Sequence, residues 1–381
     1  MSVPEPEILD DADALAARDS GNLLWQLATA GAEVRRAQTA SAETGLVRLR
    51  SDVPPRALLV ATDGVHADSG RLVATAAAAR APAMVWEDSE LPQWAGSADA
   101  LLVGCQQGMS ARLATLVDAA QRRGLAIAVA APAESAVGEA AGRQPLVPVD
   151  PLTHPQAARW SVLTALLSAA TELGLIAPPR WSELADQLDS TCYDCRPGAD
   201  SYANQAKSLA LQLMESLPVV VGTGTLAAVA AETIAHSFQR IAGLRSLWAS
   251  MPNGVDRIAA VLAQDTTTSA EEDFFADRVE EVVLKPRLIL VGGERSPLLP
   301  ADFGPTAALV EESPDQAAAR EALHRLQAMA ERSNLRSWPV EVPEAPALTR
   351  FAVATTFGDF AATYVALATG RSTAETESSL L

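Results

Sequence analysis

Two titratable side chains stand four residues apart in a segment that we expect to be helical. Glu232 and His236 belong to residues 226–240, which follow the turn Gly222-Thr223-Gly224. Side chains at positions i and i+4 share one face of a helix. A carboxylate next to an imidazole can accept and donate protons near neutral pH, as general acid–base chemistry requires. The alternative is a solvated pair on the helix surface with no chemical role.

Cys192-x-x-Cys195 is the next candidate, as a zinc or redox motif. A structural zinc site needs about four ligands, and no second Cys or His pair accompanies this one. We therefore interpret the two thiols as loop residues near the junction of two lobes. The histidines lack the local spacing of a metal site, and no G-x-G-x-x-G follows the first strand, so we expect neither a metal nor a cofactor. The four histidines are His66, His154, His236 and His324.

The composition predicts a soluble protein with two domains. The 381 residues exceed what one core usually organises, and no apolar run reaches the roughly 18 residues of a membrane span. A formal net charge of −18 would repel nucleic acid and anionic membranes, so we expect neither as a partner. The acidic N-terminus lacks the features of an export signal, and the three cysteines fit a reducing compartment. We therefore expect a cytoplasmic location.

Strand-like and helix-like segments alternate along both halves of the chain. In the first half, strands are expected at residues 57–61, 83–86, 100–104, 126–131 and 146–149, and helices at 21–36, 111–123 and 155–173. In the second half, helices are expected at 200–216, 226–240, 315–332 and 346–368, and strands at 217–221, 287–291, 307–310 and 338–342. This rhythm predicts an α/β fold with two Rossmann-like parallel sheets and helices on both faces. The predicted domains are residues 1–175 and 204–381, joined by a polar linker at 176–203, and we expect a frayed tail from 371 to 381.

Three segments resemble the bacterial and archaeal bifunctional phosphoglucose/phosphomannose isomerases. They are residues 204–210 (NQAKSLA), 217–224 (LPVVVGTG) and 357–367 (FGDFAATYVAL), in the order in which that family carries similar motifs. The resemblance implies two sugar isomerase (SIS) domains, a homodimer, and a sugar phosphate bound between the lobes.

The resemblance also implies where substrate and catalytic groups would lie. The phosphate would be held by loop residues and helix N-terminal amides, and an arginine would follow on the next helix. Gln239 stands where the family has its glutamate base, and an amide cannot accept the proton. The family's ring-opening histidine and late lysine have no counterpart. Glu232 or His236 could replace the base if either side chain faces the cleft. The implied substrate-binding residues are Gly108, Ser110, Arg159, Gly222, Thr223, Gly224 and Thr225.

Because these losses coincide, we expect a SIS protein that binds a carbohydrate phosphate with weak or lost isomerase activity. One alternative is an active glucose-6-phosphate or mannose-6-phosphate isomerase that interconverts aldose and ketose. The other is a scaffold without a ligand.

Overall fold

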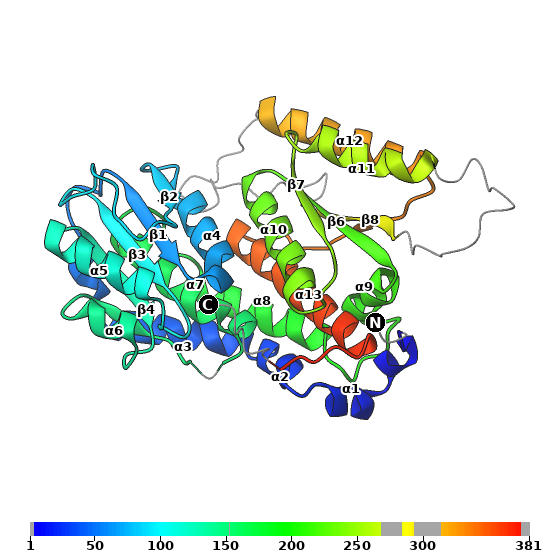
Figure 1. The fold of residues 1–381 in the computed structure, drawn as a ribbon, viewed down its shortest axis with the longest axis horizontal. Helices are drawn as coiled ribbons and strands as arrows, with labels where there is room; N and C mark the ends of the chain where they lie inside the picture. The colour runs from blue at the N-terminus through cyan, green and yellow to red at the C-terminus, as the bar shows by residue number, and fades with distance from the viewer. Residues whose placement is uncertain (1–3, 152, 268–283, 293–313, 375–381) are drawn as a thin grey trace, which may run out of the picture.

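The computed structural model describes residues 4–151, 153–267, 284–292 and 314–374, which form two parallel β-sheets with a layer of helices between them (Figure 1). Helices cover both faces of each sheet, so the predicted α/β class and Rossmann-like layering are confirmed. One continuous core joins the two lobes, because the helices between the sheets pack against both of them.

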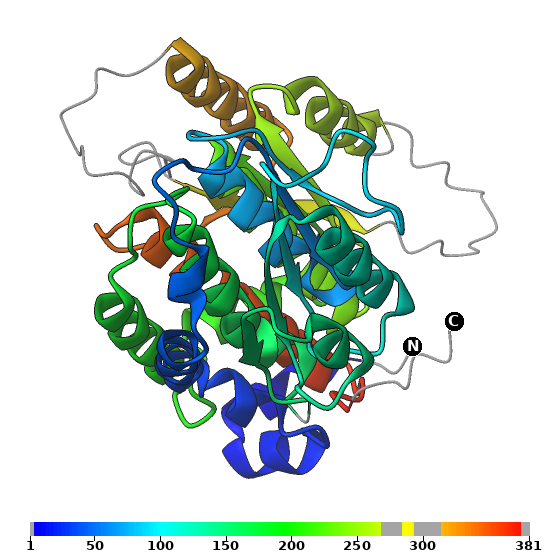
Figure 2. The same ribbon diagram turned by 90° about the vertical axis from the view of Figure 1, so that its left-hand side faces the viewer.

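The first sheet contains five strands, in the order β2 (Ala83–Val85), β1 (Leu58–Thr62), β3 (Ala100–Gly104), β4 (Ala126–Ala131) and β5 (Leu146–Pro148). Its outer face is covered by α5 (Ala111–Arg123) and α6 (Ala136–Ala141), and its inner face by α4 (Ala67–Ala77) and α7 (Pro155–Glu172) (Figure 2). Leu58 and Val60 of β1 face the inner helices, whereas Leu59 faces the outer ones. Both faces of the strand are thus buried, which explains why its sequence is continuously apolar.

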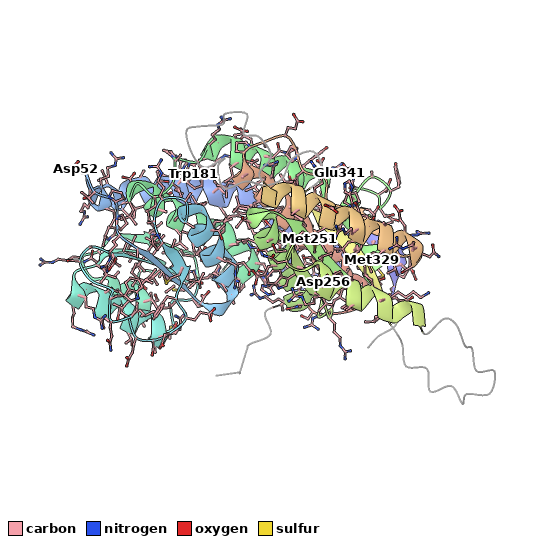
Figure 3. All side chains as sticks on the ribbon, turned by 90° about the horizontal axis from the view of Figure 1, so that it is seen from above. Asp52, Trp181, Met251, Asp256, Met329 and Glu341 are labelled. Carbon is pink, nitrogen blue, oxygen red and sulfur yellow. The ribbon has the colours of Figure 1, made fainter. Side chains whose placement is uncertain are left out.

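The second sheet contains four strands, in the order β7 (Leu247–Met251), β6 (Ser216–Thr223), β8 (Lys285–Val291) and β9 (Ser337–Pro339). Its outer face is covered by α11 (Val255–Thr267) and α12 (Pro314–Arg332), which run side by side in Figure 3, and its inner face by α9 (Gln205–Leu213), α10 (Thr225–Arg240) and α13 (Ala347–Ala368). Strand β7 has no counterpart among the predicted elements. The strand expected at 307–310 lies outside the described residues.

Helix α13 is the central element of the shared core, since each of its 22 residues is buried. Among the described helices it alone is long and apolar enough to cross a membrane. The neighbours of α13 are other helices, including α10, α9 and α8 (Trp181–Asp194). This environment accounts for its apolar composition, because a helix that is hydrophobic all round is typical of a protein core.

The motifs that carried the resemblance have structural roles in this core. Asn204 caps α9, because its Oδ1 accepts from the amides of Ala206 (3.0 Å) and Lys207 (3.1 Å). The buried Lys207 ammonium donates to two backbone carbonyls at 2.6 and 2.7 Å and lies 5.5 Å from the ring of Tyr364. These residues attach α9 and α13 to each other and to the segment before α9.

One prediction about the N-terminal half needs correction. The single helix expected at 21–36 is two helices, α2 (Leu23–Leu27) and α3 (Ala30–Glu43), with the Asp19 carboxylate capping α2 through the amides of Leu23 (2.9 Å) and Leu24 (2.8 Å). Before them lie η1 (Pro6–Asp10) and α1 (Ala12–Arg18), and after them η2 (Leu46–Leu49) and η3 (Gly64–His66).

The polar stretch at 176–203 and the start of the C-terminal tail are more ordered than the sequence suggested. Helix α8 lies within 176–203 and packs against α3 and α13, so Cys192 is a buried helical residue and not a loop thiol. In the tail, Thr373 is buried, and its hydroxyl donates to Asp19 Oδ1 at 2.6 Å.

Candidate functional site

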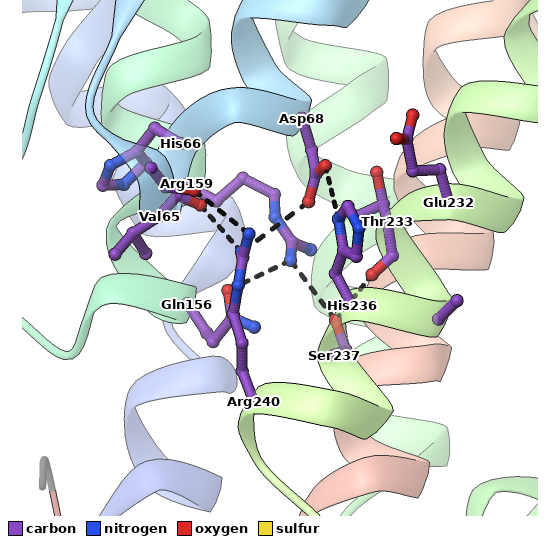
Figure 4. A network of polar contacts seen from close by, with 12 residues as sticks. Val65, His66, Asp68, Gln156, Arg159, Glu232, Thr233, His236, Ser237 and Arg240 are labelled. Atoms are coloured by element: carbon purple, nitrogen blue, oxygen red, sulfur yellow. Dashed lines mark hydrogen bonds and ion pairs between the residues drawn. The ribbon is translucent and has the colours of Figure 1, made fainter. Parts of the chain in front are cut away.

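The predicted proton-transfer pair lies on α10 where this helix packs against α4 of the first lobe (Figure 4). Each member pairs with a residue of α4: Glu232 Oε2 lies 3.0 Å from Arg71 Nε, and His236 Nδ1 lies 2.9 Å from Asp68 Oδ1. Glu232 is only 4% exposed. Glu232 and His236 therefore belong to the interface between the lobes and are not a solvated surface pair.

Burial and neighbouring charges set the ionisation of this interface. Burial raises the pKa of Glu232, and Arg71 opposes that shift only in part. Burial would also raise the pKa of Asp68, but the hydrogen bond and charge of His236, together with Arg240, lower it overall. Asp68 is thus held as a carboxylate that ties α4 to α10.

The same residues have the spacing of a metal site. Ligand atoms of Asp68, Glu232 and His236 lie within 4.8 Å of one another. However, Glu232 already pairs with Arg71, and Arg240 Nη1 lies 3.7 Å from Asp68 Oδ2. Because these two guanidinium groups supply the positive charge that the carboxylates need, the arrangement fits an ion-pair network better than a metal centre.

Arg159, the implied substrate-binding arginine, is buried in a second network. Its Nη1 and Nη2 donate to the two oxygens of Asp359 at 2.6 and 3.2 Å, and Ser237 Oγ donates to Asp359 Oδ1 at 2.5 Å. Asp359 is the acidic residue of the FGDF motif on α13. Arg159 therefore links the first lobe to the central helix through a fully occupied carboxylate.

The implied phosphate-binding residues of the first lobe shape the loop between β3 and α5. Ser110 caps α5, because its hydroxyl accepts from the amide of Leu113 at 3.4 Å. Gly108 has φ of +68°, and a Cβ there would come within 2.0 Å of Ser135 Oγ. Only glycine fits this close approach.

The implied phosphate-binding residues of the second lobe form the turn from β6 into α10. Gly224 has φ of +93°, and a Cβ on Gly222 would come within 2.2 Å of the Ala227 carbonyl oxygen. Thr223 is buried and donates to the Gly292 carbonyl at 3.2 Å, whereas Thr225 is exposed at the helix start. The turn thus keeps the tight backbone that brings an anion close to helix N-terminal amides.

A cleft of about 720 Å³ opens at the carboxyl ends of β1 and β3. Its walls come from the loops after these strands, the N-terminus of α7, the C-terminus of α10 and residues 371–374. Ligands of parallel α/β sheets bind at this edge, where loops and helix N-termini converge. The cleft has the size of a small-molecule site.

The charged side chains that line the cleft are Asp63, Arg240 and Arg371. Asp63 already accepts hydrogen bonds from the backbone amide and ring of His66 (3.1 and 2.7 Å) and from the amide of Gln106 (3.2 Å). Burial would raise its pKa, but His66 and these hydrogen bonds lower it. Asp63 is therefore a stabilised carboxylate.

The remaining cleft residues were not identified as site residues from the sequence. Gln156 and His154 line the cleft, and burial lowers the pKa of His154 to about 4. Gln239 is exposed outside the lining and donates to the Ser246 carbonyl at 3.1 Å. Arg240, its neighbour, is the residue of α10 whose charge reaches the cleft. The predicted site residues, from Gly108 to His236, contribute no side chain to the lining of this cleft.

Comparisons with known proteins agree with this architecture. Residues 202–378 match the family model described as the bacterial phospho-glucose isomerase C-terminal SIS domain. No curated protein matches the chain.

Solved structures with similar folds include the C-terminal domain of glucosamine-fructose-6-phosphate aminotransferase from Francisella tularensis (TM-score 0.57, 10% identity, 92% of this chain and 97% of that one). Another is a tagatose-6-phosphate ketose/aldose isomerase from Escherichia coli (0.55, 13%, 91% and 90%). A third is a hypothetical protein from Thermus thermophilus (0.62, 13%, 95% and 89%). The chain therefore shares the two-sheet fold of these structures, and its residues 202–378 resemble the SIS domain of bacterial phospho-glucose isomerases.

Proposed function

We propose that this protein binds a carbohydrate phosphate in the cleft at the edge of the first sheet, with weak or lost isomerase activity. One observation supports this proposal above the others: among the described residues, Arg240 and Arg371 line the cleft with Asp63 as the carboxylate, in a chain of net charge −18. Arg240 is shared with Asp68, but no described carboxylate forms a salt bridge with Arg371, and such a positive charge in an acidic protein favours an anionic ligand.

The weak or absent turnover follows from the groups available for proton transfer. Isomerisation needs a base within hydrogen-bond reach of the substrate carbon that loses a proton. Asp63 is the lining carboxylate, and its lowered pKa makes it a poor base. Glu232 and His236 are engaged by Arg71 and Asp68 outside the lining. We infer a divergent relative of the bifunctional phosphoglucose/phosphomannose isomerases whose catalytic groups have been replaced.

An active isomerase is the second candidate, and one observation favours it. The raised pKa of Glu232 is a common property of catalytic carboxyl groups. Turnover would then require a movement of α4 that frees Glu232 from Arg71.

Titration calorimetry with glucose-6-phosphate, mannose-6-phosphate and fructose-6-phosphate, beside a coupled isomerase assay on the same sample, separates the candidates. Binding without turnover is the expected result. Binding with turnover that Glu232→Gln abolishes would establish the isomerase. If none of the three compounds binds, the remaining alternative is a scaffold without a ligand.

We also propose that the protein is a cytoplasmic homodimer, as the resemblance implies. Light scattering coupled to gel filtration measures the mass directly, and the monomer mass of 39.8 kDa would refute the dimer.

A further inference from the structure

The two arginines of the cleft come from distant positions in the second half of the chain. Arg240 ends α10, and Arg371 follows α13. Arg240 donates to the carbonyls of Gly64 (3.1 Å) and Val65 (2.9 Å), and its distance of 3.7 Å from Asp68 Oδ2 exceeds a hydrogen bond. A guanidinium group has five N–H donors, so these contacts leave donors free for a ligand.

Arg371 has fewer contacts with neighbouring polar groups than Arg240. Within the described part of the chain, no carboxylate forms a salt bridge with it. A Cβ added to Gly243, which has φ of +63°, would lie only 2.0 Å from Arg371 Nη1. Glycine at position 243 therefore leaves the space through which the Arg371 side chain passes along the end of α10.

Neutral donors lie at the same wall. His154 Nδ1 accepts from the amide of Gln156 at 3.2 Å, so this imidazole caps α7, and its lowered pKa keeps it uncharged at neutral pH. Gln156 is 3% exposed, and its Nε2 has no hydrogen-bond partner among the described residues. The N-terminus of the 18-residue helix α7 adds the positive end of its dipole. A buried amide donor without a partner costs free energy that a bound acceptor would recover.

The loop that contains Asp63 has the opposite character. Its carboxylate carries a negative charge and accepts three hydrogen bonds, so a phosphate there would meet like charge. Asp63 keeps 24% of its side chain exposed, and a sugar hydroxyl can donate to the remaining lone pairs. In the resemblance, by contrast, the first-lobe residues that hold the phosphate would be Gly108 and Ser110, in the loop after β3.

We propose that the ligand binds with reversed polarity. Its phosphate contacts Arg240, Arg371 and the Gln156 amide, and its hydroxyl groups face Asp63. This inference rests on the proposed function, because it assumes that the cleft accepts a sugar phosphate. The arginine end of the cleft would recognise the dianionic phosphate group itself. Inorganic phosphate should therefore bind there even without a sugar.

Titration calorimetry of the full chain with glucose-6-phosphate, inorganic phosphate and glucose tests the polarity. Arg371→Gln should weaken both phosphate compounds at least roughly tenfold, since one charge-assisted contact is lost. Arg371→Lys should restore part of the affinity. The matched control is Arg245→Gln, which removes the same charge from an exposed residue outside the lining and should leave both affinities within about twofold.

The outcomes separate the two proposals. Wild-type binding that survives Arg371→Gln, and that Ser110→Ala abolishes, would place the phosphate at the loop after β3 and overturn the reversed polarity. If inorganic phosphate binds in a way that depends on Arg371 but glucose-6-phosphate does not bind, the anion site at Arg371 is supported and the sugar phosphate ligand is refuted. No binding of either compound by the wild-type protein would refute both.

Discussion

The buried pair between Arg159 and Asp359 provides the sharpest prediction about what holds the lobes together. Their side chains are 5% and 1% exposed, and two hydrogen bonds join them. Burial raises the pKa of Asp359 even though Arg159 and Ser237 oppose the shift. The pairing thus offsets the cost of burying the charge only in part, and removal of one partner should be far worse than replacement of both.

The substitution Asp359→Asn keeps the shape of the side chain and removes its charge. It should lower the free energy of unfolding by about 3–5 kcal/mol, because the Arg159 guanidinium then stays buried without a counter-charge. The double variant Arg159→Met with Asp359→Leu should lie within about 2 kcal/mol of the wild-type protein, since no buried charge remains.

Equilibrium unfolding in urea, followed by circular dichroism, measures these differences. The matched control is Asp186→Asn, which makes the same chemical change in a pair with Arg35 whose side chains are 45% and 68% exposed. An exposed pair should contribute less than about 1 kcal/mol. Equal losses for Asp359→Asn and Asp186→Asn would refute the argument that the inter-lobe carboxylate neutralises a buried charge.

Three further predictions concern titration, the α4–α10 interface and the cleft. His154 has a pKa of about 4 in the folded protein against about 6.5 when unfolded, so the unfolded chain takes up the proton first as the pH falls. The free energy of unfolding should therefore drop between pH 6.5 and pH 4 by at most about 3 kcal/mol, and His154→Gln should flatten this part of a urea-unfolding pH profile; an unchanged profile would contradict the assignment. Glu232→Gln should cost less than about 1 kcal/mol, because burial already disfavours the charge and Arg71 remains partly solvated; a larger loss in urea would show that the ion pair is a main inter-lobe contact. Gly243→Ala should destabilise by at least about 1 kcal/mol and weaken phosphate binding by displacing Arg371, and calorimetry that finds wild-type affinity would refute this packing.

The sheet architecture was predictable because its signals are local. The apolar runs that form β1, β3 and β4 are short, buried on both faces and separated by helical patterns, which is the signature of a parallel sheet. Helix α13 was predictable for a similar reason, since apolar residues lie on every side of it and its few charged residues do not break the pattern. Strand β7 escaped because its sequence LWASM is short, mixed in polarity and half exposed.

The helix within residues 176–203 was hidden by its composition. Helix α8 reads as polar, yet Leu184, Ala185 and Leu188 form a stripe at helical spacing that packs on α3 and α13. The stripe was the available signal, and it identifies Cys192 as part of the same buried face.

The candidate site was harder to predict because it depends on contacts between distant parts of the chain. Nothing local to Arg371 indicates that it meets Arg240, 131 positions earlier, at one wall of a cleft. Likewise, the pairing of Glu232 with Arg71 and of His236 with Asp68 is set by how α10 packs on α4. The spacing within α10 correctly predicted that Glu232 and His236 share one face of the helix. It could not predict which residues of α4 contact that face.

A single nuclear magnetic resonance sample in D₂O tests the central claim most directly. Glucose-6-phosphate is incubated with the protein, saturation transfer reports binding, and the C2 proton signal reports isomerisation, because a base that abstracts this proton exchanges it with solvent deuterium. The account predicts saturation transfer to the sugar protons with no loss of the C2 proton beyond a protein-free control. Loss of the C2 proton would contradict the absence of a competent base, and absence of saturation transfer would contradict a sugar phosphate site in the cleft.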